Sequence, residues 1–321
     1  MDTSVIICAY TMSRWNELAE AVRSCTVQTS PPVEIIVVVD YNEDLFDRAR
    51  EEFPDVTVIT NKGDQGLSGA RNTGVGVARG AIIAFLDDDA YADPEWLERL
   101  TIMLEDPKVA GVGGWILPVW PQNEPRWFPQ TFYWVLGCSY LGLPEHGATI
   151  RNPIGANMAF RHRVFDSVGG FSSGLGRIGN NSLGCEETEL SIRYTDHFVD
   201  ERFVLSRNAI VHHLVPRSRL TLRYFLTRCW AEGLSKAAVA SLVGSRSGLA
   251  AERGHLVRAL PREIAQSGRE LLRDPRNAAS RIGLILAGSG CAAAGLARGK
   301  LAIRRAPHLV HRVRVEGDHH V

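Results

Sequence analysis

Residues 81–89 read Ala-Ile-Ile-Ala-Phe-Leu-Asp-Asp-Asp, an apolar run that ends in three adjacent carboxylates. The apolar part has the length and composition of a buried strand. Three neighbouring carboxylates repel one another unless a cation lies among them, and carboxylate oxygens are ligands that suit Mg²⁺ and Mn²⁺. The segment therefore predicts a metal–diphosphate site at the carboxyl end of a buried strand. A solvated turn with an acidic helix cap is the alternative that the triplet alone leaves open.

Strands and helices alternate on both sides of this segment. We expect strands at 5–9, 34–40, 56–60, 81–86 and 109–112, and helices at 16–27, 42–53, 69–79 and 94–104. Continuous β-branched runs that alternate with helices are typical of an α/β fold with a mostly parallel sheet covered on both faces. Ligands of such sheets bind at the carboxyl ends of the strands. Asp40 ends a second strand in the same way, which supports a site at this edge.

The pattern changes after residue 114. Residues 115–134 contain four of the seven Trp and four Pro, which predicts a loop-rich segment without regular structure. The segment would form a sugar-stacking wall, a lip over a lipid or an aromatic core. Residues 218–243 predict an amphipathic helix that either docks on the catalytic part or meets a membrane surface. The uncharged run Ile282–Ala297 is short for a bilayer span, and we expect an interfacial or packed helix there.

These changes divide the chain into two predicted domains. A catalytic domain would cover 1–217, with a donor half up to residue 114 and an acceptor half from 115, and a basic helical extension would cover 218–321. From residue 250 onward there are 13 Lys/Arg and 6 Asp/Glu, although the whole chain has 36 of each. A basic tail suits an anionic surface such as phospholipid or a phosphate-bearing substrate, and an acidic remainder suits a cation.

The composition excludes some classes of protein. Of the 321 residues, 45% are hydrophobic and 22% charged, which indicates a globular protein with a core rather than a disordered chain. None of the six Cys forms a C-x-x-C pair, so the sequence suggests neither a zinc site nor a redox pair and favours a reducing compartment. No signal peptide precedes the first strand, so we expect the catalytic part to face the cytoplasm.

The chain resembles the family 2 inverting glycosyltransferases with the GT-A fold. The resemblance covers about residues 3–235, and the matching segments follow the family's order. They are Val5–Tyr10, Val39–Asp40, Gly66–Gly74, Phe85–Asp89, Pro94 with Leu97, Gly155–Phe160, Gly169–Phe171 and Cys185–Leu190. The segments 155–160 and 184–189 are also similar to the subgroup that extends lipid-linked saccharides, including glucuronosyl transfer to glucosyl-dolichyl phosphate.

The resemblance implies a role for each matched position. Asp89 and His213 would hold Mg²⁺ or Mn²⁺, and Glu187, with Glu186 beside it, would be the catalytic base. Contacts to the nucleotide-diphosphate sugar would come from Ala9, Tyr10, Asp40, Arg71, Asp87 and Asp88. Glu187 stands where the family usually has Asp, and its extra methylene would seat the acceptor differently. As alternatives, the two Glu are an acidic first helical turn, His213 is structural and Arg71 is a helix-surface charge.

One base and one metal site predict a single displacement with inversion. We expect it to act on a saccharide or lipid-linked acceptor in polysaccharide, glycolipid or lipid-linked saccharide synthesis. The predicted location is the inner face of the plasma membrane, and no nucleic acid is expected as a partner. A nucleotidyltransferase and a non-catalytic nucleotide-sugar-binding scaffold are the alternatives. Nucleotidyltransferases often carry an early Gly-rich phosphate loop, and Ala9–Ser13 contains no Gly.

Overall fold

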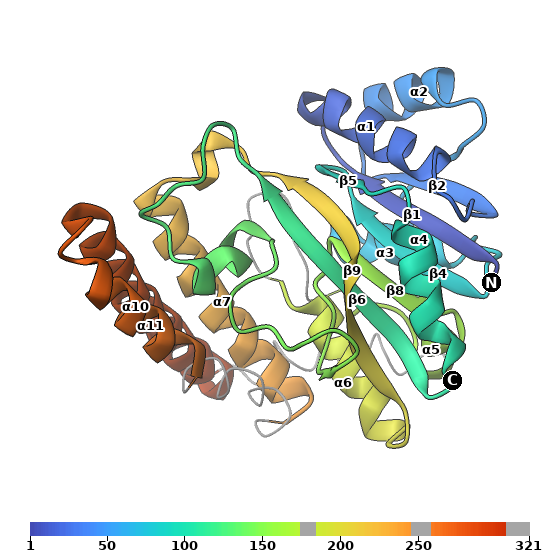
Figure 1. The fold of residues 1–321 in the computed structure, drawn as a ribbon. Coiled ribbons are helices and arrows are strands. Elements are labelled where there is room, and N and C mark those ends of the chain that lie inside the picture. Colours follow the sequence, from blue (N-terminus) through green and yellow to red (C-terminus); the bar gives the residue numbers. More distant parts are fainter. Residues whose placement is uncertain (174–183, 245–257, 306–321) are drawn as a thin grey trace.

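A single mixed sheet forms the centre of the molecule (Figure 1). The computed structural model describes residues 1–173, 184–244 and 258–305. In this part of the chain the sheet has nine strands in the order β3-β2-β1-β4-β8-β6-β9-β5, with β7 paired to β9. The strands are β1 (Thr3–Ala9), β2 (Glu34–Val39), β3 (Thr57–Thr60), β4 (Ile82–Asp87), β5 (Ala90–Ala92), β6 (Val109–Val119), β7 (Thr149–Ile150), β8 (Asn157–Arg161) and β9 (Arg202–Leu214). Strands β1 to β4 are parallel, and β8 runs antiparallel to β4 and β6.

Helices cover both faces of the sheet, which confirms the predicted α/β class. One face packs against α1 (Trp15–Thr26), α2 (Glu43–Glu52) and α4 (Trp96–Thr101), and the other against α3 (Leu67–Val75), α5 (Arg163–Val168) and α6 (Glu186–His197). Short 3-10 turns η1 (Met12–Arg14) and η2 (Ile102–Glu105) flank α1 and α4. Val5 and Ile7 of β1 face the first layer and Ile6 faces the second, as the two-residue period of a strand requires.

The prediction of no regular structure at 115–134 is wrong at both ends of that segment. Strand β6 continues to Val119, and a 3-10 helix η3 spans Gln130–Leu136. The strand tolerates Pro118 because β6 pairs with β9 along one edge up to Val119, whereas its pairing with β8 ends at Gly113. A proline without an N–H donor is accommodated where one edge of the strand carries no ladder.

The aromatic residues of this segment form a separate core. Phe128, Phe132 and Tyr133 are buried and pack with Phe225 and Ile285 from the C-terminal helices. The Phe128 and Phe225 rings lie 5.4 Å apart, edge to face, a favourable arrangement. Of the three alternatives for this segment, the structure contains the aromatic core, and that core joins the C-terminal helices to the sheet.

The C-terminal helices form a tightly packed layer at the left of Figure 1. After the 3-10 turn η4 (Arg217–Arg219) come α7 (Leu222–Leu242), α10 (Leu260–Glu270) and α11 (Pro275–Arg305). The helix predicted at 218–243 begins later because Thr221 caps it by accepting a hydrogen bond from the Tyr224 N–H. Helices α7 and α11 approach closely: a Cβ at Gly233 would lie 2.1 Å from the Ala292 carbonyl oxygen. The uncharged run predicted at 282–297 is thus the middle of a helix that is packed on one side.

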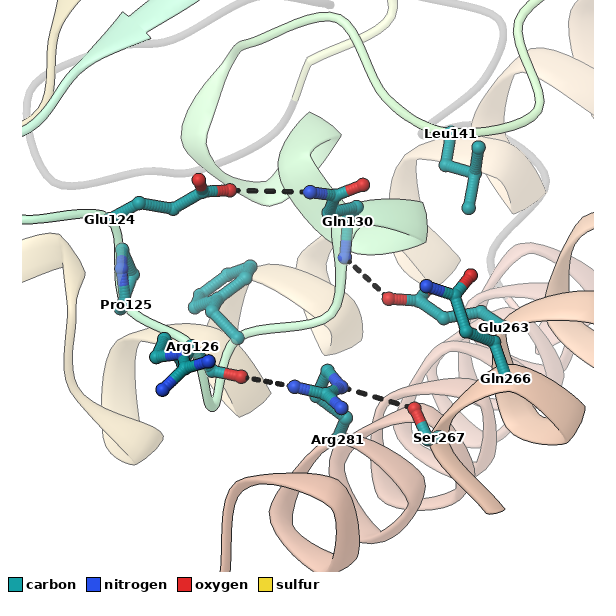
Figure 2. A pocket seen from close by; sticks show the side chains of 10 residues that line it. Glu124, Pro125, Arg126, Gln130, Leu141, Glu263, Gln266, Ser267 and Arg281 are labelled. Carbon is teal, nitrogen blue, oxygen red and sulfur yellow. Dashed lines mark hydrogen bonds between the residues drawn. The ribbon is translucent and has the colours of Figure 1, made fainter. Parts of the chain in front are cut away.

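A buried carboxylate fastens α10 to the aromatic core (Figure 2). Glu263 accepts hydrogen bonds from the Gln130 N–H at 2.8 Å and the Thr131 N–H at 2.9 Å, the first amides of η3. Nearby, Arg281 of α11 donates to the Arg126 carbonyl oxygen and to Ser267 Oγ. The hollow between these groups is therefore lined by side chains that already bond one another, and none of the predicted site residues lines it.

Candidate active site

Carboxylates from two parallel strands meet at one edge of the sheet. Asp87 is the last residue of β4 and is in register with Cys8 of β1. Asp40 directly follows β2, whose last residue is in register with Ala9. Because β1 lies between β2 and β4, the end of β1 separates the two acidic groups. The next residue, Tyr10, is about half exposed, and the Arg14 guanidinium lies 5.5 Å from the centre of its ring.

Asp40 organises the loop that leads into α3. Its carboxylate accepts hydrogen bonds from Asn61 Nδ2 at 2.7 Å and from the Gly66 N–H at 3.0 Å. An open hollow of about 610 Å³ lies along this loop, lined by Tyr41, Lys62, Gly63, Asp64, Gly69, Asn72, Thr73 and Ser173. Asp40 itself does not line the hollow, and a contact between its carboxylate and the nucleotide base stays a prediction.

Asp87, Asp89 and His213 form a group that could hold a metal ion. One ligand atom from each lies within 4.8 Å of the others. His213 reaches the acidic turn because its strand β9 pairs with β5, which follows Asp89, with His213 opposite Ala90. Two hard oxygens and an imidazole nitrogen suit Mn²⁺ or Mg²⁺. Asp88 Oδ2 is also buried here without a hydrogen-bond partner among the described residues, so the donor set fits a divalent cation.

Two arginines surround the same turn. Arg14, from η1, lies 2.7 Å from Asp88 Oδ1 and 3.3 Å from Asp89 Oδ2. Arg219, from η4, lies 3.1 Å from Asp89 Oδ2, and both partners are buried. These cations balance a carboxylate cluster that would otherwise be expensive to bury. They also concentrate positive charge beside the Asp87–Asp89 turn.

Burial and the neighbouring charges shift the pKa values of Asp88, Asp89 and His213. Burial alone would raise the pKa of Asp89, but His213, Arg219 and Arg14 hold it well below its usual range. Burial and the neighbouring Asp89 raise the pKa of Asp88 to about 7, against the pull of Arg14. Burial opposes protonation of His213, yet Asp89 at 3.2 Å raises its pKa to about 10. Asp89 is therefore ionised at neutral pH.

Arg71 joins the acidic turn to the start of α6. Its guanidinium lies 2.7 Å from Glu186 Oε1 and 3.5 Å from Asp87 Oδ1, and it donates to the Gly155 carbonyl oxygen at 3.1 Å. The side chain is 2% exposed, so Arg71 is not a helix-surface charge. The guanidinium is thus held by Glu186, Asp87 and the Gly155 carbonyl group, and its contact with the donor stays a prediction.

Glu186 and Glu187 differ in their surroundings. Glu186 is buried and bonded to Arg71, whereas Glu187 is partly exposed. Burial and then the Glu186 charge raise the pKa of Glu187 to about 8, in the range where a carboxylate is an effective base near neutral pH. The preceding Cys185 has a φ of 76°, an uncommon conformation for a residue with a side chain. This turn presents Glu187 in the first turn of α6.

The sequence did not reveal three of the charged residues near this edge. Arg14 lies outside every pattern that we used, and Arg219 was expected on an amphipathic helix rather than beside Asp89. Lys236 belongs to α7 and is only 8% exposed. Arg14 and Arg219 come from segments far along the chain from their partners, so no local spacing signals those contacts.

The sequence is similar to those of known proteins. The profile of Glycosyl transferase family 2 matches residues 4–169. A glucosyl-dolichyl phosphate glucuronosyltransferase of Haloferax volcanii is 35% identical over 240 residues, which cover 74% of this chain and 76% of that protein. The succinoglycan biosynthesis protein ExoM of Rhizobium meliloti is 27% identical over 270 residues, covering 76% and 81%.

A solved structure shows the same fold. The mannosyltransferase PcManGT from Pyrobaculum calidifontis, in complex with GDP-Man and Mn²⁺, aligns with a TM-score of 0.56 at 16% identity. The alignment covers 90% of this chain and 86% of that chain. At this identity the likeness concerns the arrangement of helices and strands.

Proposed function

The chain belongs to glycosyl transferase family 2 and transfers a sugar from a nucleotide-sugar donor, and we propose that its acceptor is a lipid-linked saccharide. Family membership removes the nucleotidyltransferase and the non-catalytic scaffold as alternatives. The observation that carries the proposed reaction is the chain of contacts from Asp87 through Arg71 to Glu186, the residue next to Glu187. It supports Glu187 as the base and the Asp87–Asp89 turn as the diphosphate site. The relative from Haloferax volcanii, named for transfer to glucosyl-dolichyl phosphate, supports the lipid-linked acceptor.

In the proposed reaction, Glu187 takes the proton of an acceptor hydroxyl as its oxygen attacks the anomeric carbon. The new C–O bond forms on the face opposite the leaving group, and the nucleoside diphosphate departs with the electron pair of the broken bond. One base and no covalent intermediate give inversion. A bound Mg²⁺ or Mn²⁺, held by Asp87, Asp89 and His213, would neutralise the departing diphosphate. Arg14 and Arg219 add positive charge on the same side.

A donor screen followed by a transfer assay tests this function. Nucleotide sugars are compared by thermal shift with Mn²⁺, where a ligand at about 100 times its Kd adds about 2.7 kcal/mol. The selected donor is then offered dodecyl phosphate-linked glucose. We expect release of the nucleoside diphosphate and a glycosylated lipid. A donor that stabilises the protein but gives only hydrolysis, with no lipid product, would contradict the proposed acceptor.

We also propose that the protein lies on the cytoplasmic surface of a membrane through α11. By length and composition this helix is apolar enough to cross a bilayer, a weak indication by itself. Its outer face exposes Leu286 (62%) and Leu301 (50%), and Arg276 and Arg298 are exposed towards its two ends. An apolar face with flanking cations suits an anionic membrane surface. The six cysteines are free thiols, which supports a reducing compartment.

Replacing Leu286 by Glu is expected to weaken binding to anionic vesicles by about tenfold or more, since burying one leucine contributes about 1.5–3 kcal/mol. Co-sedimentation with phosphatidylglycerol vesicles measures the change. Val199→Glu, at an 80% exposed position after α6, is the matched control and should bind like the unchanged protein. Equal binding of both variants would exclude this face as the contact.

A further inference from the structure

One face of α7 carries buried charge. Arg228, Glu232 and Lys236 follow one another at four-residue spacing and so share a face of the helix. Arg228 and Lys236 are each 8% exposed, and Lys236 Nζ lies 3.2 Å from Glu232 Oε1. Lysine and arginine are rarely so deeply buried, because desolvating a charge is costly. This face therefore has two cations and one carboxylate in a place where apolar residues would be expected.

Contacts fix this face against the start of α6. Ser235 Oγ accepts a hydrogen bond from the Gly184 N–H at 3.1 Å, and the Cys185 thiol points to Glu232 Oε1 at 3.7 Å. Val239 packs in a small apolar cluster with Cys185. Since Glu186 and Glu187 follow Cys185 directly, the charged face of α7 lies beside the proposed base.

Electrostatics agree with this placement. Burial and Glu186 raise the pKa of Glu187, and Arg71 and Lys236 oppose the rise. Lys236 is therefore within electrostatic range of the base. Arg71 itself is engaged by Glu186 and Asp87 on the donor side. Lys236 therefore brings positive charge close to Glu187 from α7, an element other than the one that carries Arg71.

We propose that Lys236 and Arg228 form a subsite for the phosphate of a phosphate-linked acceptor and so direct its hydroxyl to Glu187. The inference rests on the proposed lipid-linked acceptor and names the residues that would recognise it. A phosphate accepts charge-assisted hydrogen bonds from ammonium and guanidinium groups. Glu232 would serve as the counter-ion of Lys236 before the acceptor binds. Binding of the acceptor phosphate would be the function of the buried Lys236 and Arg228 side chains.

Steady-state kinetics with two acceptors test the subsite. Dodecyl phosphate-linked glucose carries the phosphate, and dodecyl glucoside lacks it. For Lys236→Gln we expect KM for the phosphate acceptor to rise about tenfold or more, as for a lost hydrogen bond to a charged group. KM for the glucoside and KM for the donor should stay unchanged. Lys236→Arg should restore much of the affinity, and Lys108→Gln, at an exposed lysine, should behave like the unchanged protein.

The outcomes separate the alternatives. Glu232→Gln/Lys236→Gln leaves the net charge of the face unchanged and guards against misfolding of the single variant, and it should give the same selective rise in KM. An equal rise for both acceptors would overturn the subsite, and a raised donor KM would assign the cations to the leaving diphosphate instead. If the unchanged protein uses neither acceptor, the proposed function fails, and this inference fails with it.

Discussion

Replacing Glu187 by Gln lowers the rate of sugar transfer by about 10²–10⁴-fold, the usual contribution of a general base. Gln keeps the size of the side chain but cannot accept the proton of the acceptor hydroxyl. Donor binding should stay close to normal, because the proposed base acts on the acceptor and Glu187 is not one of the proposed metal ligands. Steady-state rates and a donor titration on the same protein separate the two effects.

Glu51→Gln is a suitable control for this variant, because Glu51 is an exposed glutamate of α2. It should retain the full rate. Full activity of Glu187→Gln would exclude Glu187 as the base. A loss of activity in Glu186→Gln would not by itself identify the base. Glu186 is paired with Arg71, so its replacement disturbs the contacts of Arg71 in the site.

The pH profile gives a second measurement of Glu187. Because burial and Glu186 raise its pKa to about 8, the carboxyl is protonated and inactive as a base at lower pH. We therefore expect kcat/KM to rise with pH and to reach about half of its plateau near pH 8, since this parameter reports the free enzyme. Glu187→Gln should lose this rise. A profile that is flat between pH 6 and pH 9 would contradict Glu187 as the titrating base.

Replacing Asp89 by Asn is expected to abolish metal-dependent donor binding. A lost ligand should weaken the metal site by more than about a hundredfold, because changes to residues behind the ligands alone typically cost 10–100-fold. Asp89 also forms ion pairs with Arg14, Arg219 and His213. The variant loses these ion pairs, so we expect it to be less stable as well. Calorimetric titration of the donor with and without Mn²⁺ measures the binding, and thermal unfolding without ligand measures the stability.

Asp87→Asn separates metal binding from folding. Asp87 is partly exposed and pairs with Arg71 at 3.5 Å, so less buried charge is left behind when it is neutralised. It should lose metal-dependent binding with a smaller drop in stability. Asp55→Asn, at an exposed position, serves as the control. If donor titrations of both site variants respond to Mn²⁺ as the unchanged protein does, this group is not the metal site.

Arg71 links the proposed metal site to the residue next to the proposed base. It contacts Asp87, a proposed metal ligand, and Glu186, the neighbour of the proposed base. A buried guanidinium with fixed partners holds both groups in one geometry, and small displacements of reacting groups are costly for the rate. The sequence motif contained Arg71, but this bridging contact spans 115 residues of chain.

Local patterns in the sequence determined the donor half. The apolar run before Asp87, the strand that ends at Asp40 and the helices between them predicted a parallel sheet with an acidic carboxyl edge. Most of these strands and helices formed close to their predicted bounds, since buried β-branched runs and helical periodicity are local signals; β6, which extends to Val119, and α3, which ends at Val75, are the exceptions. The resemblance carried by the ordered motifs gave the family, which the comparisons confirmed.

The tertiary structure alone decided which charges meet. It brought Arg14, Arg219 and His213 to Asp89, paired Glu186 with Arg71 while leaving Glu187 partly exposed, and set Lys236 beside the start of α6. It also packed aromatic residues of the Trp/Pro segment 115–134 against α7 and α11 in one core. Ion pairs and aromatic contacts depend on distance in space, and these partners are separated by tens of residues or more. Periodicity, which reports only the face of a single element, cannot encode them.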